Sequence, residues 1–348
     1  MLGPHIDIRT KPMATKQVRK SAGSAMDDLF GSQPEDQPVG DDMAISPVSA
    51  RVLDAAVEIM DDDPDTQIGF LHSTLAMCGL PYHKPPKDQT EYIRKNGKAS
   101  LLITSGKLMD PNSGEWAPQG LPYGARSRLI LVHLCTEAIR TRTKVIEVGN
   151  SMCGFMKTLG IEPTGGKKGT IGSFKEQVNR LAAARLQIGT WTHAPGGHEQ
   201  AVTVNAQPFR GVQLLSENPG HKVLWSPTVE LETEFFESLL KFAVPLEYRA
   251  VAAIKHSPMA LDVYSWLANR LHRVKDPSFI SWDALYLQFG GGYARMVDFR
   301  RKFLATLQLA CTVYPQAKLE LVDGKGIRLF NSPPPIAKRL IAVKGVDG

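Results

Sequence analysis

Two segments of the chain present secondary-structure signals in the same order, and this repetition constrains the fold more than any other feature. In the later segment, Ser257 begins an apolar-striped helix, and Ser281 caps a short helix that stops at Gly290–Gly292. A long helix is predicted over about 294–313, and two alternating runs around Asp323–Gly324 predict a β-hairpin. Helices followed by a hairpin in this order indicate a winged-helix domain.

The earlier segment shows a similar order. A strong helix over about 124–140 precedes a strand at 144–148 and a short helix that Ser151 caps. Ser173 and Glu176, three positions apart, have the spacing of a capping box and predict a further helix that starts at Ser173. Strand-like runs follow at 186–193, 200–206 and 211–215. The sequence therefore predicts an α+β fold with two winged-helix domains in tandem.

The expected division of the chain is as follows. Residues 1–45 are polar and rich in Gly, Pro, Ser and Asp, and we expect them to be a disordered leader. We expect residues 46–220 to form the first winged-helix domain, for dimerisation and DNA binding. A helix at 47–60 begins it, and a strand is predicted at 99–104. Residues 221–335 form the second domain, which reads most of the DNA, and 336–348 form a tail.

Charge is unevenly distributed along the 348 residues, whose formal net charge is +6. Residues 1–65 contain 6 Lys/Arg and 13 Asp/Glu, which leaves 35 Lys/Arg and 22 Asp/Glu for residues 66–348. The body is therefore basic and favours a polyanionic partner, with nucleic acid as the first candidate. A protein that merely has a high isoelectric point is the alternative.

The stretch GGGYARMVDFRRKFLATLQLA, residues 290–310, carries the main candidate site. Read as a helix, it places Met296, Phe299 and Phe303 on a packed face and cations on the other. A helix that packs one face and projects cations fits the major groove of DNA, where Arg reads guanine edges and Lys contacts phosphate. The candidates here and in the following hairpin are Arg295, Arg300, Arg301, Lys302, Lys325 and Arg328.

The earlier segment offers a weaker candidate site around the predicted helix 173–186. Two lysines precede its N-terminus, where backbone amides and the helix dipole favour an anion. DNA phosphate is one such anion. A nucleotide is a poor alternative, because GGKKGT lacks the spacing of a phosphate-binding loop. The candidates are Lys167, Lys168, Lys175, Gln177, Asn179 and Arg180.

Other classes of function find little support in the sequence. A DNA-nicking enzyme would need a His-x-His pair, whereas His193 and His198 have four residues between them and lie within a turn. The four cysteines are widely spaced, so neither disulfides nor a structural zinc site is expected. We expect no catalytic centre and no cofactor. Without an 18-residue apolar stretch or a signal-peptide pattern, we also expect a cytoplasmic protein with no membrane span.

Several motifs together resemble a known family. FLHSTLAMCGLPYHKP, LLITSGKL, LPYGARSRLILVHLCTEAIRT, HSPMALDVYSWLANRLHRV and FGGGYARMVDFRRKFLATL are similar to plasmid-encoded RepA replication initiators, close to those of IncW-type broad-host-range plasmids. The resemblance covers roughly residues 50–332. It implies tandem winged-helix domains that bind repeated origin sequences, called iterons, and help to melt an AT-rich region. It also implies a homodimer that represses or bridges origins, and recruitment of the host initiator and replicative helicase.

The function that we expect is therefore initiation of plasmid replication through double-stranded origin DNA, without enzymatic activity. A sequence-specific transcriptional repressor that never initiates is the alternative within DNA binding. A DNA-nicking initiator enzyme, or an interaction protein whose basic face binds other acidic partners, represents a different class.

Overall fold

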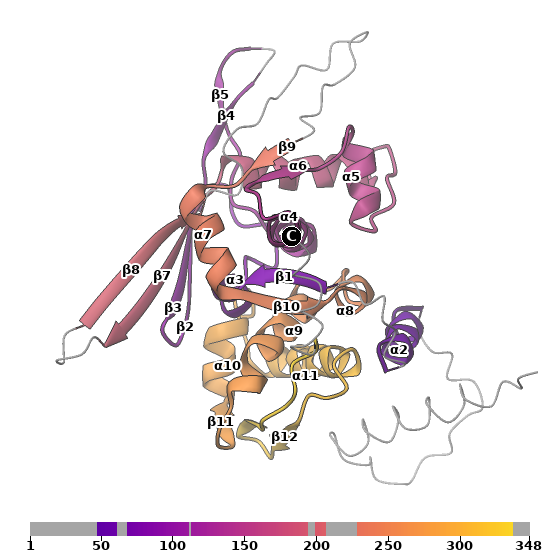
Figure 1. The fold of residues 1–348 in the computed structure, drawn as a ribbon, viewed down its shortest axis with the longest axis vertical. Helices are drawn as coiled ribbons and strands as arrows, with labels where there is room; N and C mark the ends of the chain where they lie inside the picture. Colours follow the sequence, from indigo (N-terminus) through magenta and orange to yellow (C-terminus); the bar gives the residue numbers. More distant parts are fainter. Residues whose placement is uncertain (1–46, 61–67, 111–112, 194–198, 207–227, 337–348) are drawn as a thin grey trace, which may run out of the picture.

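The computed structural model describes residues 47–60, 68–110, 113–193, 199–206 and 228–336 (Figure 1). The expected leader, the strand-like run 211–215, His198 and most of the expected tail lie outside these residues. Within the described parts, no helix has the length and apolar composition needed to cross a membrane.

Helices and strands are mixed along the chain, which confirms the α+β class. The helices are α2 (Pro47–Met60), α3 (Ser73–Met77), α4 (Gly124–Thr141), α5 (Met152–Thr158), α6 (Thr170–Ala183), α7 (Thr233–Phe242), α8 (Tyr248–Ala253), α9 (Pro258–Arg270), the 3₁₀ turn η1 (Leu271–Arg273), α10 (Trp282–Phe289) and α11 (Met296–Thr312). The strands are β1 (Ile68–His72), β2 (Glu91–Asn96), β3 (Ala99–Thr104), β4 (Lys107–Met109), β5 (Trp116–Pro118), β6 (Val145–Glu147), β7 (Arg185–His193), β8 (Glu199–Ala206), β9 (Thr228–Glu230), β10 (Ala243–Glu247), β11 (Ser278–Ser281), β12 (Leu319–Val322) and β13 (Gly326–Leu329).

Three helices begin where the sequence predicts, and the reason is the same in each. The side chains of Ser151, Ser257 and Ser281 accept hydrogen bonds from backbone amides in the first turns of α5, α9 and α10. Each bond satisfies an amide that the helix itself leaves unpaired. These caps fix the start of α5 in the earlier half and the starts of α9 and α10 in the later half.

The early and late parts of the chain meet in a two-stranded antiparallel sheet. Strand β1 pairs with β10, with Gly69 opposite Leu246, across a separation of more than 170 residues. In Figure 1 this pair lies between α4 on one side and α9 on the other, and it contacts both helices. The pair therefore links the two halves of the fold.

A larger antiparallel sheet has the order β2-β3-β7-β8 and extends away from the helices in Figure 1. Leu101 and Ile103 of β3 and Leu186 and Ile188 of β7 are buried on its inner face. Buried and half-buried residues alternate along β3, so the other face of the sheet is partly covered. The β7–β8 pairing confirms two of the predicted strand runs.

The later half forms a unit of three helices and a small sheet. Helix α9 packs against α11, and the short helix α10 lies between them in the chain. Strands β12 and β13 form the predicted hairpin, and β11 joins it in the order β11-β13-β12. The hairpin follows α11 after a short connection, and Arg300 of α11 donates to the Gly324 carbonyl in the hairpin turn, so the helix and the turn lie beside one another.

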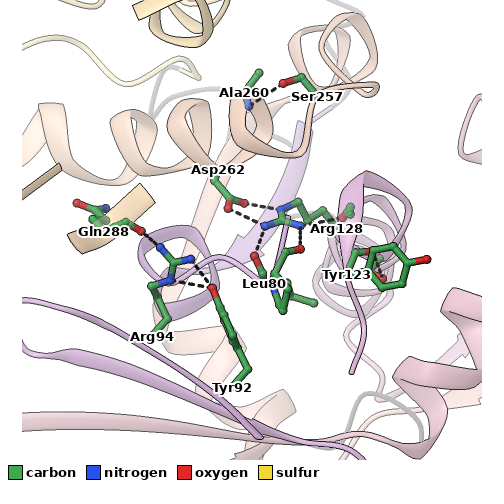
Figure 2. A network of polar contacts seen from close by, with 12 residues as sticks. Leu80, Tyr92, Arg94, Tyr123, Arg128, Ser257, Ala260, Asp262 and Gln288 are labelled. Carbon is green, nitrogen blue, oxygen red and sulfur yellow. Dashed lines mark hydrogen bonds and ion pairs between the residues drawn. The ribbon is translucent and has the colours of Figure 1, made fainter. Parts of the chain in front are cut away.

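A buried polar network connects the two halves (Figure 2). The Arg128 guanidinium of α4 forms a two-point ion pair with Asp262 of α9 and donates to the carbonyl of Leu80 at 2.5 Å. Arg94 of β2 donates to the Tyr92 hydroxyl and to the backbone carbonyl of Gln288 in α10. Because both arginines are almost fully buried, these contacts stabilise one arrangement of the halves.

Contacts also cross the expected domain boundary at residues 220 and 221. Strand β9, beyond that boundary, pairs with β6, and α7 packs against α4 and β8. Helix α2, from the start of the chain, packs instead against α8 and α11. One hydrophobic cluster runs through both halves, from Val52 to Leu329. The division into two domains stays a prediction.

Candidate DNA-binding surface

Helix α11 has one packed face and one cationic face. Phe299, Phe303 and Leu307 are completely buried, and the two phenylalanine rings contact the aromatic rings of α10 at 5.3–6.1 Å. On the opposite face, the side chain of Arg301 is 84% exposed and Lys302 is exposed. The core contacts therefore fix the direction in which the cations project.

The first turn of α11 carries a small charge cluster. Arg295, at the N-cap position, donates from Nε to Asp298 Oδ2 at 2.6 Å, and Arg301 Nη2 lies 3.5 Å from Asp298 Oδ1. The hydrogen bond from Arg295 holds the pKa of the Asp298 carboxyl below its usual range. One carboxylate thus faces two guanidinium groups, which leaves net positive charge. Exposed pairs of this kind are weak, so a phosphate can compete for either arginine.

Arg300 does not project with its exposed neighbours, and its expected role in reading bases stays a prediction. Its guanidinium lies 5.0 Å from the centre of the Trp282 ring, and Nη2 donates to the backbone carbonyl of Gly324 at 2.9 Å. The side chain is half-buried. Arg300 therefore links the start of α10, the second turn of α11 and the hairpin turn, and these contacts hold the three elements together.

The hairpin turn contributes a further exposed cation. Lys325 is exposed, while its backbone carbonyl accepts from the amide of Trp282 at 3.0 Å. Gly324, with a φ of 63°, allows the tight turn. Arg328 is directly opposite Glu320 in the register of the hairpin and donates to its carboxylate at 3.0 Å. Lys325 is therefore available to an anion, whereas the charge of Arg328 is partly neutralised.

In the earlier half, two of the candidate residues lie at the N-terminus of α6. Lys167 and Lys168 are exposed in the loop just before Gly169, the N-cap residue. Thr164 and Thr170 hydrogen-bond to each other's backbone amides at 2.9 and 3.0 Å and close this loop. The loop thus places two cations beside a helix N-terminus, which itself favours anions.

The capping box predicted at Ser173 and Glu176 is wrong, because α6 begins at Thr170. Ser173 lies within the first turn and donates to the carbonyl of Thr170. Glu176 instead forms ion pairs with Lys84 at 2.8 Å and with Arg180 at 2.9 Å. Partial burial raises the pKa of Glu176, but the bond from Lys84 and the charge of Arg180 outweigh it and lower this pKa overall.

Two further candidates on α6 are buried, which corrects the expectation that they contact DNA. Gln177 is 3% exposed, and its side-chain oxygen accepts from Ser127 Oγ at 2.7 Å and from the Tyr123 amide at 3.0 Å. Arg180 is 9% exposed and donates to the carbonyl of Leu121 at 2.7 Å. Both residues attach α6 to the start of α4 rather than face solvent.

The remaining α6 candidates, Lys175 and Asn179, are half-buried.

The later half brings together four exposed cations on α11 and the turn after it, which are Arg295, Arg301, Lys302 and Lys325. Sequence reasoning missed the supporting role of Trp282 and the bridging role of Asp298. The Arg295–Asp298–Arg301 spacing of three residues, which places side chains on one helix face, could have indicated the latter.

These features define an α+β protein with a packed helix and hairpin that present cations to solvent. Residues 121–284 match the family model described as plasmid encoded RepA protein, which confirms the resemblance of the chain to that family. The match includes α4 to α9 and ends within α10, so α11 lies beyond it.

Comparison with solved structures gives a match to selenomethionine derivatives of domains 2 and 3 of RctB. The TM-score is 0.45 at 10% sequence identity, and the match covers 74% of this chain and 97% of that chain. The search of curated proteins found no match.

Proposed function

We propose that the protein is a plasmid replication initiator that binds double-stranded DNA at repeated sequences in the plasmid origin. The observation that carries the proposal is the cationic face of α11, where Arg301 and Lys302 project from a helix whose other face is completely packed. The match to plasmid-encoded RepA over residues 121–284 supports the biological setting.

Each half supplies one winged-helix domain in this proposal. In the later domain, α11 enters the major groove as the recognition helix, and the β12–β13 turn places Lys325 near the backbone. In the earlier domain, the exposed Lys167 and Lys168 contact phosphate at the N-terminus of α6. Phosphate contacts supply affinity that falls with salt, and base-edge contacts of Arg301 supply sequence preference.

Initiation itself follows from DNA binding through steps that need other partners. Bound to its iterons, the protein promotes melting of the adjacent AT-rich DNA and brings in the host initiator and replicative helicase. It acts without a catalytic centre of its own, and a homodimer of the chain represses or bridges origins. The protein works in the bacterial cytoplasm.

A replication assay tests initiation separately from DNA binding. A plasmid that keeps the origin but lacks the gene is introduced into cells that express the chain from a second replicon. Replication of the test plasmid supports the initiator. Repression of the gene's promoter without replication would mean that the protein is a transcriptional repressor. Relaxation of supercoiled origin DNA with Mg²⁺ would instead reveal a nicking enzyme.

A further inference from the structure

A second group of cations lies where the early and late parts of the chain meet, apart from the cationic face of α11. It surrounds His256, which follows α8 and directly precedes the N-cap residue of α9. Three cations lie close enough for their charges to act on the His256 ring, and these are Arg51 of α2, Arg126 near the start of α4 and the adjacent Lys255. These four residues form the His256 cluster, to which both halves of the fold contribute.

Two members of the His256 cluster are accessible and have no partner. His256 is exposed and Arg126 is half-buried. Within the described part of the chain, neither side chain forms a hydrogen bond or pairs with an acid. Lys255 donates from Nζ to the carbonyl of Gly160 at 2.6 Å, which leaves two of the three ammonium donors. Donors for an anion are therefore present at the surface.

The charges that act on His256 are all positive. Burial lowers the pKa of His256, and each of the three cations of the cluster lowers it further. Like charges held together without a counter-charge repel one another, so an anion that binds among them is favoured. The adjoining segments carry acids, none of which acts on the His256 ring, and these are Asp54, Glu58, Glu162, Glu247 and Asp262.

The His256 cluster also connects the two candidate DNA-contact surfaces. Gly160, which binds Lys255, begins the loop that carries the exposed Lys167 and Lys168. Helix α2, which carries Arg51, packs against both α8 and α11. In Figure 1, α8 lies between α5 and α11, with α2 beside it. The elements of the cluster therefore link the loop before α6 to the helix that carries the main cationic face.

We propose that the His256 cluster binds the DNA backbone between the two grooves that the two halves enter, with Arg126 and His256 donating to phosphate oxygens. This proposal rests on the proposed function, because it takes one duplex to contact both halves. Guanidinium and imidazolium N–H groups form strong, charge-assisted hydrogen bonds to phosphate. Lys255 and Arg51 add positive charge around them. Such contacts position the duplex and carry no sequence information.

Protonation of His256 is part of this contact. The cations of the cluster disfavour the imidazolium in the free protein, whereas a bound phosphate favours it. Binding therefore raises the pKa of His256 and takes up a proton. A group whose pKa is higher in the complex than in the free protein strengthens binding as the pH falls. DNA affinity should accordingly rise as the pH is lowered from about 7.5 to about 6.

Fluorescence anisotropy of the full chain, on an origin-repeat duplex and a random duplex of equal length, tests the charge of Arg126. Arg126→Ala should weaken binding to both duplexes about three- to tenfold. It should also reduce the slope of log K against log salt by about 0.9, the value for one phosphate. Arg126→Lys keeps the charge and should retain the slope of the wild type. Lys95→Ala is the matched control, because Lys95 is an exposed cation on β2 outside the cluster.

The same measurement at about pH 7.5 and about pH 6 tests His256. His256→Gln keeps a side chain that donates hydrogen bonds but cannot titrate. The wild type should gain about three- to tenfold in affinity on acidification, since uptake of one proton changes affinity by at most about tenfold for each pH unit. His256→Gln should gain less on both duplexes.

Three results would overturn the proposal. The first is that Arg126→Ala has the affinity and salt slope of Lys95→Ala on both duplexes. The second is that Arg126→Lys loses as much affinity as Arg126→Ala, which would assign Arg126 to packing. The third is that the wild type and His256→Gln depend equally on pH.

The two duplexes keep this proposal separate from the proposed function. Phosphate contacts do not depend on sequence, so the random duplex tests the His256 cluster even where the protein does not prefer the origin repeats. Equal binding of the wild type to both duplexes, with the losses expected for Arg126→Ala and His256→Gln, would support the cluster and count against origin recognition.

Discussion

Arg128 and Asp262 form a two-point ion pair that joins α4 to α9, with Nε–Oδ1 at 2.6 Å and Nη2–Oδ2 at 2.8 Å. Their side chains are 5% and 7% exposed. Gly79 allows the approach, because a Cβ at that position would lie 1.8 Å from Asp262 Oδ2. The fold thus encloses a charged pair between its early and late halves. Each buried charge is compensated by the charge of its partner.

The first prediction concerns this pair. Asp262→Leu should destabilise the protein by about 3–5 kcal/mol, because it leaves a buried guanidinium without its counter-charge. Arg128→Met should cost a similar amount. The double variant should be much less destabilised than the sum of the two, since both charges are gone. Urea unfolding of the four proteins measures this coupling, and additive losses would show that the pair does not act as a unit.

A second prediction separates the two neighbouring arginines of α11. Arg301→Ala should leave stability within about 0.5 kcal/mol, because the side chain is 84% exposed. It should weaken binding to origin repeats by about 1–3 kcal/mol and relax specificity at one position. Arg300→Ala should instead cost about 1–2 kcal/mol of stability, because it loses the Trp282 contact and the bond to Gly324.

Thermal unfolding and binding to matched and random duplexes distinguish these outcomes. If Arg301→Ala weakens binding to the matched and the random duplex equally, Arg301 does not read bases. An unchanged Tm for Arg300→Ala would contradict its positioning role.

A third prediction concerns phosphate contacts. Lys302→Ala and Lys325→Ala should weaken binding to specific and random DNA alike, because phosphate carries no sequence information. Each should reduce the slope of log K against log salt by about 0.9, the value for one neutralised phosphate. Fluorescence anisotropy at four salt concentrations measures the slopes. Arg328→Ala is the matched control, since its charge already pairs with Glu320, and its slope should change less.

A fourth prediction follows from His72, which caps α3. The residue is 2% exposed, and burial lowers its pKa from 6.5 to about 4. Its Nδ1 accepts from the Thr74 amide at 3.1 Å, which requires the neutral ring. The unfolded chain takes up a proton below pH 6.5, whereas the folded chain does so only near pH 4. Stability should therefore fall as the pH is lowered through this window, by about 3 kcal/mol in total.

Urea unfolding between pH 7 and pH 5 measures the slope before most carboxylates titrate. His72→Asn keeps a side-chain acceptor at the cap but cannot titrate, so its stability should depend less on pH. A slope equal to that of the wild type would assign the pH dependence to other groups. His133 contributes in the same direction, because burial also lowers its pKa.

Local signals in the sequence predict much of the fold. The three serine caps, the extent of α11 and the hairpin around Asp323–Gly324 depend on neighbouring residues, and each is present in the structure. The two-faced character of α11 could be predicted for the same reason. Spacing along one helix determines which side chains share a face.

Long-range contacts account for the side-chain positions that spacing along the chain did not predict. Glu176 has the spacing of a capping residue, yet Lys84, 92 positions away, binds it. Gln177 and Arg180 look like exposed polar residues on α6 until the start of α4 covers them. The same applies to Arg300, whose partners Trp282 and Gly324 belong to separate elements. Spacing within a helix cannot show which face another element will cover.

A footprint on the plasmid's intergenic region tests the central claim most directly, with wild-type protein and Arg301→Ala compared at two salt concentrations. The wild type should protect direct repeats, each about two helical turns long, because its two domains bind successive major grooves. Arg301→Ala should lose this pattern of protection at a lower salt concentration than the wild type does. Diffuse protection that disappears with modest salt, and that is the same for both proteins, would mean that the cationic face of α11 does not read origin DNA.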